Sequence, residues 1–313
     1  MNPFYTDYSE YLASIFPGRK MQKISVNAGF SCPNRDGTIG RGGCIYCVNT
    51  SFTPAYCFRD SEGRDAAVTP ELLVSSQLEA GKQFFARKYP AMEYLAYFQS
   101  YTNTFGDPRL LERLYRTALE TERVAGLIVG TRPDTVSEAT LRLLGELNRS
   151  YPVFVELGAE SSFDETLRLV NRGHTWETLC LTARRLADAG IRVGLHFIAG
   201  LPGEGAEEVL TTVSRGISLP VDSFKFHQLQ VLEGSELARR VARKELEVCA
   251  FELDQYLDLC ERIVEIVPKR ICIERFLASA PPNTVIMPKW GIKNHEFVNM
   301  LLNRLKAKTG IIK

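Results

Sequence analysis

The chain has 313 residues, of which 45% are hydrophobic and 24% charged, with a formal net charge of +1. This is the composition of a globular protein with a sizeable core, and the near-zero charge excludes a surface coated with basic residues for nucleic acid. No apolar run approaches the roughly 18 residues of a membrane-spanning helix, and Met1–Ser14 lacks the basic start and apolar stretch of a signal peptide, so we expect a cytoplasmic protein.

Strand and helix signals alternate along most of the chain. The expected strands are Gln22–Ala28, Glu93–Gln99, Val124–Gly130, Pro152–Leu157, Arg192–Ala199 and Ser223–Val231. The helices between them are marked by Thr69-Pro70-Glu71, Asp107-Pro108, Ser137, Thr175 and the stretch from about Glu204 to Ile217. The first should stop before Pro90, and Gly190 should end the fourth.

Several of these strands are apolar nearly throughout, as in a parallel sheet covered on both faces. Six β/α units in residues 22–235 predict an α/β fold, a partial (β/α)6 barrel of the TIM type. An open doubly wound sheet would give nearly the same pattern. Residues 1–21 are expected to form an N-terminal extension.

Residues 236–313 are expected to form a C-terminal α+β extension packed on the barrel. It reads as an acidic helical stretch, a strand at Arg270–Phe276 and a basic helix near Asn294–Lys308. Between Met287 and Lys313 there are six Lys or Arg residues and one acid, Glu296. Such a tail either contacts RNA phosphates or forms an ordinary solvated helix face.

Three of the eight cysteines lie close together after the first expected strand, with the spacing C-x11-C-x2-C: Cys32, Cys44 and Cys47. The other five are expected to pack as small apolar side chains: Cys57, Cys180, Cys249, Cys260 and Cys272. A disulfide framework is not expected in the cytoplasm.

Thiolates bind soft metals, and three cysteines on a four-iron cluster leave one iron open to a further ligand. The loop is rich in glycines that let the backbone wrap closely around such a group, namely Gly37, Gly40, Gly42 and Gly43. The alternative is a structural zinc site with Cys57 as the fourth ligand. Residue spacing leaves both readings open.

The cysteine loop, with Tyr46 before its last cysteine, resembles the radical SAM superfamily. Three further motifs resemble the branch that contains the catalytic subunit of Elongator: Thr131-Arg132-Pro133-Asp134, Val155-Glu156-Leu157-Gly158-Ala159-Glu160-Ser161 and Asn171-Arg172-Gly173-His174-Thr175. Two others, Leu201-Pro202-Gly203 and Lys225-Phe226-His227-Gln228-Leu229, are similar to a stand-alone bacterial family, the YhcC-like proteins. The resemblance spans roughly Gln22 to Leu237.

This resemblance implies a [4Fe-4S] cluster on Cys32, Cys44 and Cys47, and S-adenosylmethionine (SAM) as cosubstrate. Implied SAM-binding residues are Tyr46 at the adenine, Glu160 at the ribose, Arg172 at the methionine carboxylate, and also Gln99, Ser100, Thr131 and Leu201. The segment Gln99–Asn103 lacks the glycines usual in relatives. Lys225 and His227 alternate with two phenylalanines and are expected to line the substrate pocket as catalytic residues, whereas His196 is expected to be an ordinary core residue.

The resemblance also implies a function. We expect a radical SAM enzyme that modifies tRNA, at a wobble uridine, with electrons from a flavodoxin- or ferredoxin-like donor. The 313 residues leave no room for the acetyltransferase domain of Elongator subunits, so a modification other than acetyl transfer is expected. The alternatives are a radical SAM enzyme acting on a small molecule such as a porphyrinogen, and a non-catalytic zinc- or cluster-stabilised binding module.

Overall fold

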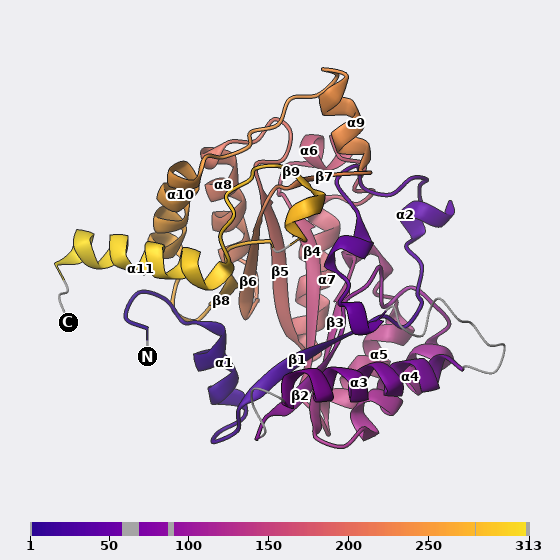
Figure 1. The fold of residues 1–313 in the computed structure, drawn as a ribbon. Coiled ribbons are helices and arrows are strands. Elements are labelled where there is room, and N and C mark those ends of the chain that lie inside the picture. The colour runs from indigo at the N-terminus through magenta and orange to yellow at the C-terminus, as the bar shows by residue number, and fades with distance from the viewer. Residues whose placement is uncertain (1, 58–68, 87–90, 279, 311–313) are drawn as a thin grey trace.

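A computed structural model of the chain describes residues 2–57, 69–86, 91–278 and 280–310, and Figure 1 shows their fold. At its centre is a seven-stranded sheet in the order β1-β2-β3-β4-β5-β6-β8, with every pairing parallel. The strands are β1 (Met21–Val26), β2 (Glu93–Phe98), β3 (Val124–Thr131), β4 (Val153–Glu160), β5 (Arg192–Ala199), β6 (Ser223–Gln228) and β8 (Cys272–Arg275). The sheet curls into a half barrel, which confirms the partial-barrel prediction.

Most of the helices cover the convex face of this sheet, whereas the first packs on part of its concave face (Figure 1). The helices are α1 (Tyr8–Ile15), α2 (Pro33–Asp36), α3 (Pro70–Ala86), α4 (Pro108–Glu120), α5 (Glu138–Asn148), α6 (Asp164–Leu169), α7 (Trp176–Asp188), α8 (Ala206–Ile217), α9 (Glu236–Ala242), α10 (Leu253–Ile266) and α11 (Asn294–Thr309). The expected caps form: Asp107, Ser137 and Thr175 each accept a backbone N–H with a side-chain oxygen. Pro90 lies outside the described residues. Within the described ranges, no helix is long and apolar enough to span a bilayer.

The two faces of the sheet bury different groups. Ala96 and Phe98 of β2 belong to the large core between the sheet and the outer helices. Their neighbour Leu95 faces the other way and packs with Leu12 and Phe16 of the N-terminal segment. Because α1 occupies this part of the concave face, the cavity lies toward the carboxyl-terminal ends of the strands.

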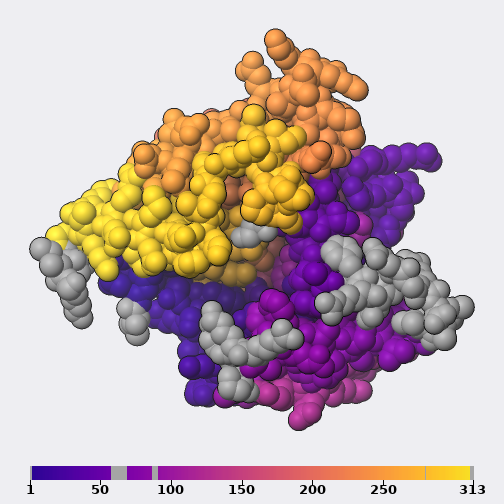
Figure 2. Space-filling view, in the orientation of Figure 1, coloured from indigo at the N-terminus to yellow at the C-terminus, as the bar shows by residue number. Residues whose placement is uncertain are grey.

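The C-terminal extension completes the sheet, which sequence patterns did not predict. β8 pairs in parallel with β6 as a seventh strand, and the expected sixth strand ends at Gln228, short of Val231. The short strands β7 (Val231–Leu232) and β9 (Val285–Met287) form a separate antiparallel pair. The N-terminal segment also contacts the C-terminal extension, since the Tyr5 ring packs edge-on against Phe276 with ring centroids 5.5 Å apart. Indigo and yellow segments accordingly lie side by side in Figure 2.

Helix α11 is the expected basic helix, but part of its charge is neutralised within the molecule. Arg304 forms ion pairs with Asp258 and Glu261 of α10, and Lys308 pairs with Glu265. The acidic and basic stretches of the sequence are therefore partners of each other, and these two cations are less available for RNA than expected.

Candidate active site

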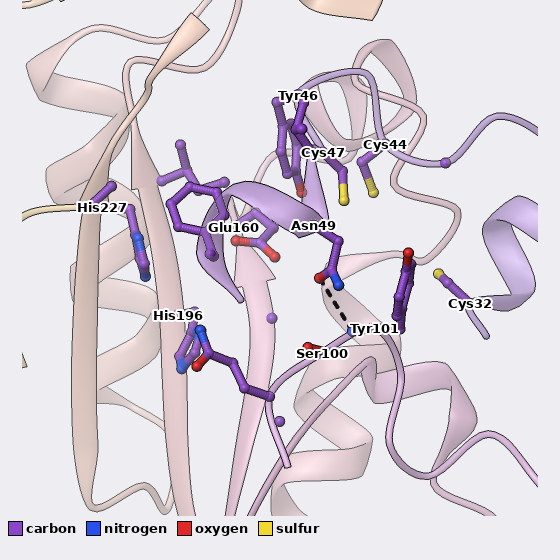
Figure 3. A pocket seen from close by; sticks show the side chains of 18 of the residues that line it. Cys32, Cys44, Tyr46, Cys47, Asn49, Ser100, Tyr101, Glu160, His196 and His227 are labelled. Carbon is purple, nitrogen blue, oxygen red and sulfur yellow. Dashed lines mark hydrogen bonds between the residues drawn. The ribbon is translucent and has the colours of Figure 1, made fainter. Parts of the chain in front are cut away.

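A cavity of about 260 Å³ opens at the carboxyl-terminal ends of the strands, and Figure 3 shows part of its wall. Most of the site residues predicted from the sequence line this cavity: Cys32, Cys44, Tyr46, Cys47, Gln99, Ser100, Thr131, Glu160, Arg172, Lys225 and His227. Leu201, also expected to contact SAM, is not among the lining residues: its fully buried side chain packs with Ile45, Val170 and Leu229 in an apolar group. It lies behind the wall of the cavity instead of in it.

The cysteine loop wraps around one end of the cavity. Gly42 and Gly43 have φ angles of +81° and +78°, which favour glycine just before Cys44. A Cβ on Gly43 would also come within 2.7 Å of the Arg35 side chain. In Figure 3 the sulfur atoms of Cys44 and Cys47 lie side by side, with Cys32 facing them.

The chemistry of this end suits a metal cluster. All three cysteines are unpaired, and burial, with the nearby Cys44, raises the pKa of the Cys47 thiol to about 12. A thiolate at this position therefore needs a cationic partner, which a metal centre supplies.

The loop at residues 170–172 forms hydrogen bonds with the cysteine loop. The Asn171 side-chain amide donates to the carbonyl oxygen of Gly43 at 2.7 Å, and the Ile45 N–H donates to the Val170 carbonyl at 3.0 Å. The Arg172 Nη1 lies 3.7 Å from the Cys44 sulfur as a hydrogen-bond donor. This part of the sequence motif thus fixes the position of Cys44.

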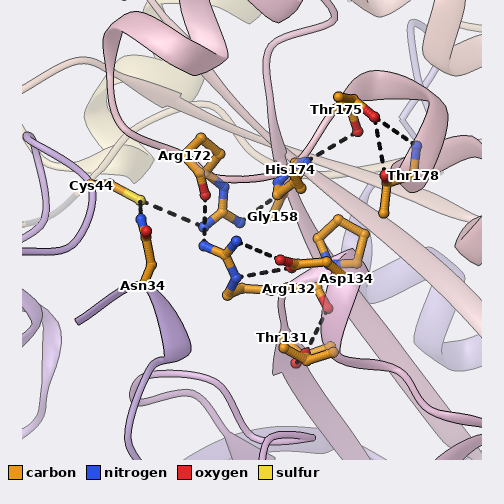
Figure 4. A network of polar contacts seen from close by, with 12 residues as sticks. Asn34, Cys44, Thr131, Arg132, Asp134, Gly158, Arg172, His174, Thr175 and Thr178 are labelled. Atoms are coloured by element: carbon orange, nitrogen blue, oxygen red, sulfur yellow. Dashed lines mark hydrogen bonds and ion pairs between the residues drawn. The ribbon is translucent and has the colours of Figure 1, made fainter. Parts of the chain in front are cut away.

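Arg172 joins the cysteine loop to the end of β4 (Figure 4). Its Nη2 donates to the Gly158 carbonyl at 2.7 Å and lies 3.4 Å from a Glu160 carboxylate oxygen. Burial opposes its charge, but Tyr46, Cys44 and Glu160 together raise the pKa of Arg172. Its Nε is buried and has no hydrogen-bond partner among the described residues. Nη2 thus has two protein partners, whereas Nη1 has the single contact with Cys44 among the described residues and keeps a second N–H for a ligand.

A further layer of contacts holds this arginine in place. Arg132, itself 2% exposed, donates through Nη1 to the Arg172 carbonyl at 2.7 Å and makes a two-pronged ion pair with Asp134. A ring nitrogen of His174 lies 3.2 Å from the Gly158 carbonyl. Burial, assisted by Arg172, lowers the pKa of His174 to about 3, so its ring is neutral at pH 7.

Strained backbone occurs beside the same cavity. Tyr101 and Glu160 have φ angles of +62° and +65°, although neither is a glycine. The Tyr101 N–H donates a hydrogen bond to the Asn49 side-chain oxygen at 3.3 Å. At Glu160 the pairing of β4 with β5 shifts register. Such strain concentrates at functional sites. Burial raises the pKa of Glu160, and Arg172 and Arg132 oppose that shift.

Polar side chains at the ends of β2 and β3 supply hydrogen-bonding groups to the wall. The Gln99 side-chain oxygen accepts from Ser25 Oγ at 2.8 Å, and Ser100 Oγ lies 3.2 Å from Thr53 Oγ1. Thr131 Oγ1 lies 2.7 Å from the hydroxyl of Thr104. These groups keep hydroxyl and amide functions at the positions where the resemblance implies SAM.

Four charged side chains lie deeper in the half barrel, two buried (Glu156 and Lys225) and two largely buried (Lys23 and Glu274), and sequence reasoning missed all but Lys225. Lys23 Nζ is 2.6 Å from both Glu156 and Glu274, and Lys225 Nζ is 3.1 Å and 3.3 Å from the same two carboxylates. We call these four residues the charge quartet. His196, expected to be an ordinary core residue, lines the cavity and lies 2.6 Å from Glu156.

The four charges of the quartet shift one another's pKa values. Burial opposes ionisation of Glu156, but Lys225, Lys23 and His196 hold its pKa well below the usual range. Burial lowers the pKa of Lys225, and both glutamates oppose that shift. One signal could have found this network, because a charged residue interrupts each of several otherwise apolar strands.

Cys57, the fourth ligand of the zinc alternative, is engaged elsewhere. Its sulfur donates to the Ser25 carbonyl at 3.4 Å, and burial raises its pKa to about 12. It does not line the cavity. Among the described residues, no three His, Cys, Asp or Glu side chains converge closely enough to hold a single metal ion.

Comparison with known proteins places this cavity in context. Residues 36–215 match the model of the radical SAM superfamily, and residues 221–307 match the Radical_SAM C-terminal domain. Protein YhcC of Escherichia coli is 36% identical over 87% of this chain and 83% of its own length. A tRNA uridine(34) acetyltransferase of Methanocaldococcus infernus is 26% identical over 59% of this chain, but over only 34% of its own length. The solved structure of M. infernus Elp3 with an N-terminal deletion aligns with a TM-score of 0.65, at 18% identity, over 94% of this chain and 64% of that one.

Proposed function

The chain belongs to the radical SAM superfamily, whose cofactors are a [4Fe-4S] cluster and SAM, and to its YhcC-like family; on that premise we propose that Cys32, Cys44 and Cys47 hold the cluster. The observation that carries this assignment is that three unpaired cysteines line one cavity at the carboxyl-terminal edge of the half barrel. In parallel β/α folds this edge is where chemistry takes place. When bound along the cavity that Cys32, Cys44 and Cys47 line, the cluster and SAM would supply radical chemistry driven by one electron from an external donor.

The residues of the chain hold and orient these groups. Arg172 places a positive charge beside Cys44 and aligns Glu160, whose carboxylate is suited to the two ribose hydroxyls of SAM. Its unpartnered Nε and the second N–H of Nη1 would remain for the methionine carboxylate. Lys225 and His227, at the other end of the cavity, would face the substrate.

Cluster loading tests the ligand assignment. After anaerobic reconstitution, wild-type protein should contain about four iron atoms per chain. Cys32→Ala, Cys44→Ala and Cys47→Ala should each retain little iron. Cys57→Ala is the matched control, since it removes a buried thiol outside the cavity and should leave the iron content unchanged. Equal loss of iron in the control would contradict the assignment and restore the zinc-type alternative.

We further propose tRNA as the substrate, modified at a wobble uridine. The support is the likeness to the tRNA uridine(34) acetyltransferase, which matches over about a third of that protein's length. Three exposed lysines outside the α10–α11 ion pairs remain for phosphate contacts: Lys289, Lys293 and Lys306. The enzyme would act in the cytoplasm with a flavodoxin- or ferredoxin-like electron donor.

Mass analysis of tRNA nucleosides tests this substrate. A strain lacking the gene should lose one modified uridine or accumulate its precursor, and the wild-type gene should restore it, whereas a Cys44→Ala copy should not. An unchanged nucleoside profile would contradict the tRNA proposal and favour a small-molecule substrate.

A further inference from the structure

Arg275 is a cation that faces the cavity without a negative partner. It is the last residue of β8 and is paired in register with Lys225 of β6. Arg275 lines the cavity, and its Nε is buried without a hydrogen-bond partner in the described structure. No described carboxylate forms an ion pair with it. Among the described residues, its side-chain hydrogen-bond partner is His227, with both ring nitrogens 3.4 Å from Nη2.

His227 cannot neutralise this charge. A guanidinium has donors only, so the imidazole beside it can only accept. Burial and the nearby Arg275 hold the pKa of His227 well below its usual range, which leaves the ring neutral.

The neighbouring charge quartet does not neutralise it either. The quartet contains two lysines and two glutamates, each lysine within 3.3 Å of both carboxylates, and is therefore balanced within itself. Arg275 is left as a surplus positive charge at this end of the cavity. An uncompensated charge in a largely desolvated site is costly, and proteins retain such groups where a ligand supplies the counter-charge.

We propose that Arg275 is the receptor for an oxyanion carried by the substrate, a carboxylate or a phosphate, bound at the end of the cavity opposite the cysteines. In Figure 3 this is the end marked by His227. The planar fork of arginine matches both kinds of oxyanion. The anion site rests on the proposed function in one respect, namely that this cavity is the active site. Beyond that, it specifies the class of group that the substrate must carry.

Small anions probe this site directly. Full-length protein with an oxidised cluster and saturating SAM is titrated with benzoate and, separately, with inorganic phosphate, so that the carboxylate of SAM already occupies its own position. Wild type should bind one of the two saturably in the millimolar range, and Arg275→Met should weaken that binding at least tenfold. Arg262→Met, which removes an exposed arginine paired with Glu207, is the control and should bind as wild type does. Tighter benzoate binding identifies a carboxylate substrate, and tighter phosphate binding a phosphorylated one.

Stability without ligand gives a second measure. Since Arg275→Met removes a charge that has no partner, its melting temperature in anion-free buffer should equal or exceed that of wild type. The proposal is overturned by the absence of saturable anion binding in wild type, by unchanged binding in Arg275→Met, or by a melting temperature several degrees lower, which would mean a structural guanidinium. SAM cleavage by wild type is scored separately, so failure of the radical SAM assignment is distinguishable from failure of the anion site.

Discussion

Replacing Glu156 by glutamine tests whether the charge quartet is balanced. Glu156 accepts from Lys23 at 2.6 Å and from Lys225 at 3.1 Å, and its side chain is 6% exposed. The glutamine keeps the shape but leaves two lysines, the buried Lys225 and the largely buried Lys23, with one carboxylate, Glu274. Removal of one partner from a buried ion pair typically costs about 3–5 kcal/mol.

The size of the effect can be converted to a melting temperature. An unfolding entropy of about 2.1 cal/mol/K per residue makes 1 kcal/mol correspond to about 1.5 °C for a chain of this length. Glu156→Gln should therefore melt about 4–8 °C below wild type in anaerobic calorimetry at a fixed scan rate. Glu236→Gln, at a half-exposed carboxylate on the surface helix α9, is the control and should have the melting temperature of wild type.

A double variant separates charge balance from simple loss of contacts. Glu156→Gln with Lys225→Met restores neutrality, because Lys23 and Glu274 remain as a pair at 2.6 Å. The double variant should melt above Glu156→Gln alone, which is non-additive behaviour expected of coupled residues. Additive losses, or a single variant within about 1 °C of wild type, would refute the reasoning that these four charges compensate one another.

Three further predictions follow from the geometry. In Gly158→Ala the new Cβ would come within 2.4 Å of Arg172 Nη2, so calorimetric SAM affinity should fall at least about tenfold; unchanged affinity would remove this contact from the SAM site. His174 has a pKa of about 3 when folded, below about 6.5 when unfolded, so the unfolded chain takes up the proton first and stability falls as pH drops below about 6.5. Between pH 7.5 and pH 5.5, the free energy of unfolding measured in urea should fall by about 1 kcal/mol more in wild type than in His174→Gln. Equal losses in the two proteins would contradict this prediction. Each phosphate contact contributes about −0.7 to the slope of log binding constant against log salt concentration for RNA. The double variant Lys289→Glu with Lys293→Glu should therefore make this slope less negative by more than 1. Binding of tRNA by wild type that does not depend on salt would contradict the tRNA proposal.

Much of the fold could be predicted because local signals and the global pattern agree. Asp107 with Pro108 marks a helix start by side-chain chemistry alone, and the structure contains that cap. The apolar strand at Arg192–Ala199 was also predicted to the residue. The pairing of β8 with β6 could not be predicted, because the acidic helical stretch hides the return of the chain to the sheet and β8 has only four residues.

The parts of the candidate site that could be predicted consist of chemically distinctive residues that lie close together in the sequence. The cysteine loop shows three thiols within 16 residues, and the structure brings them to one cavity. The charge quartet and Arg275 could not be assembled in this way, since Lys23 and Glu274 lie at opposite ends of the chain and meet only when the half barrel forms. The partners of Arg304 are a similar case, because a basic tail and an acidic helix say nothing separately about their contact.

Cleavage of SAM under anaerobic reduction tests the central claim most directly. With dithionite and no substrate, reconstituted wild-type protein should form 5′-deoxyadenosine, measured by liquid chromatography, and Cys57→Ala should do the same. Cys44→Ala, which removes the thiol held by Arg172 and Asn34, should form none above background. Formation of 5′-deoxyadenosine by Cys44→Ala at the wild-type rate, or none from wild type with its iron fully loaded, would contradict the account.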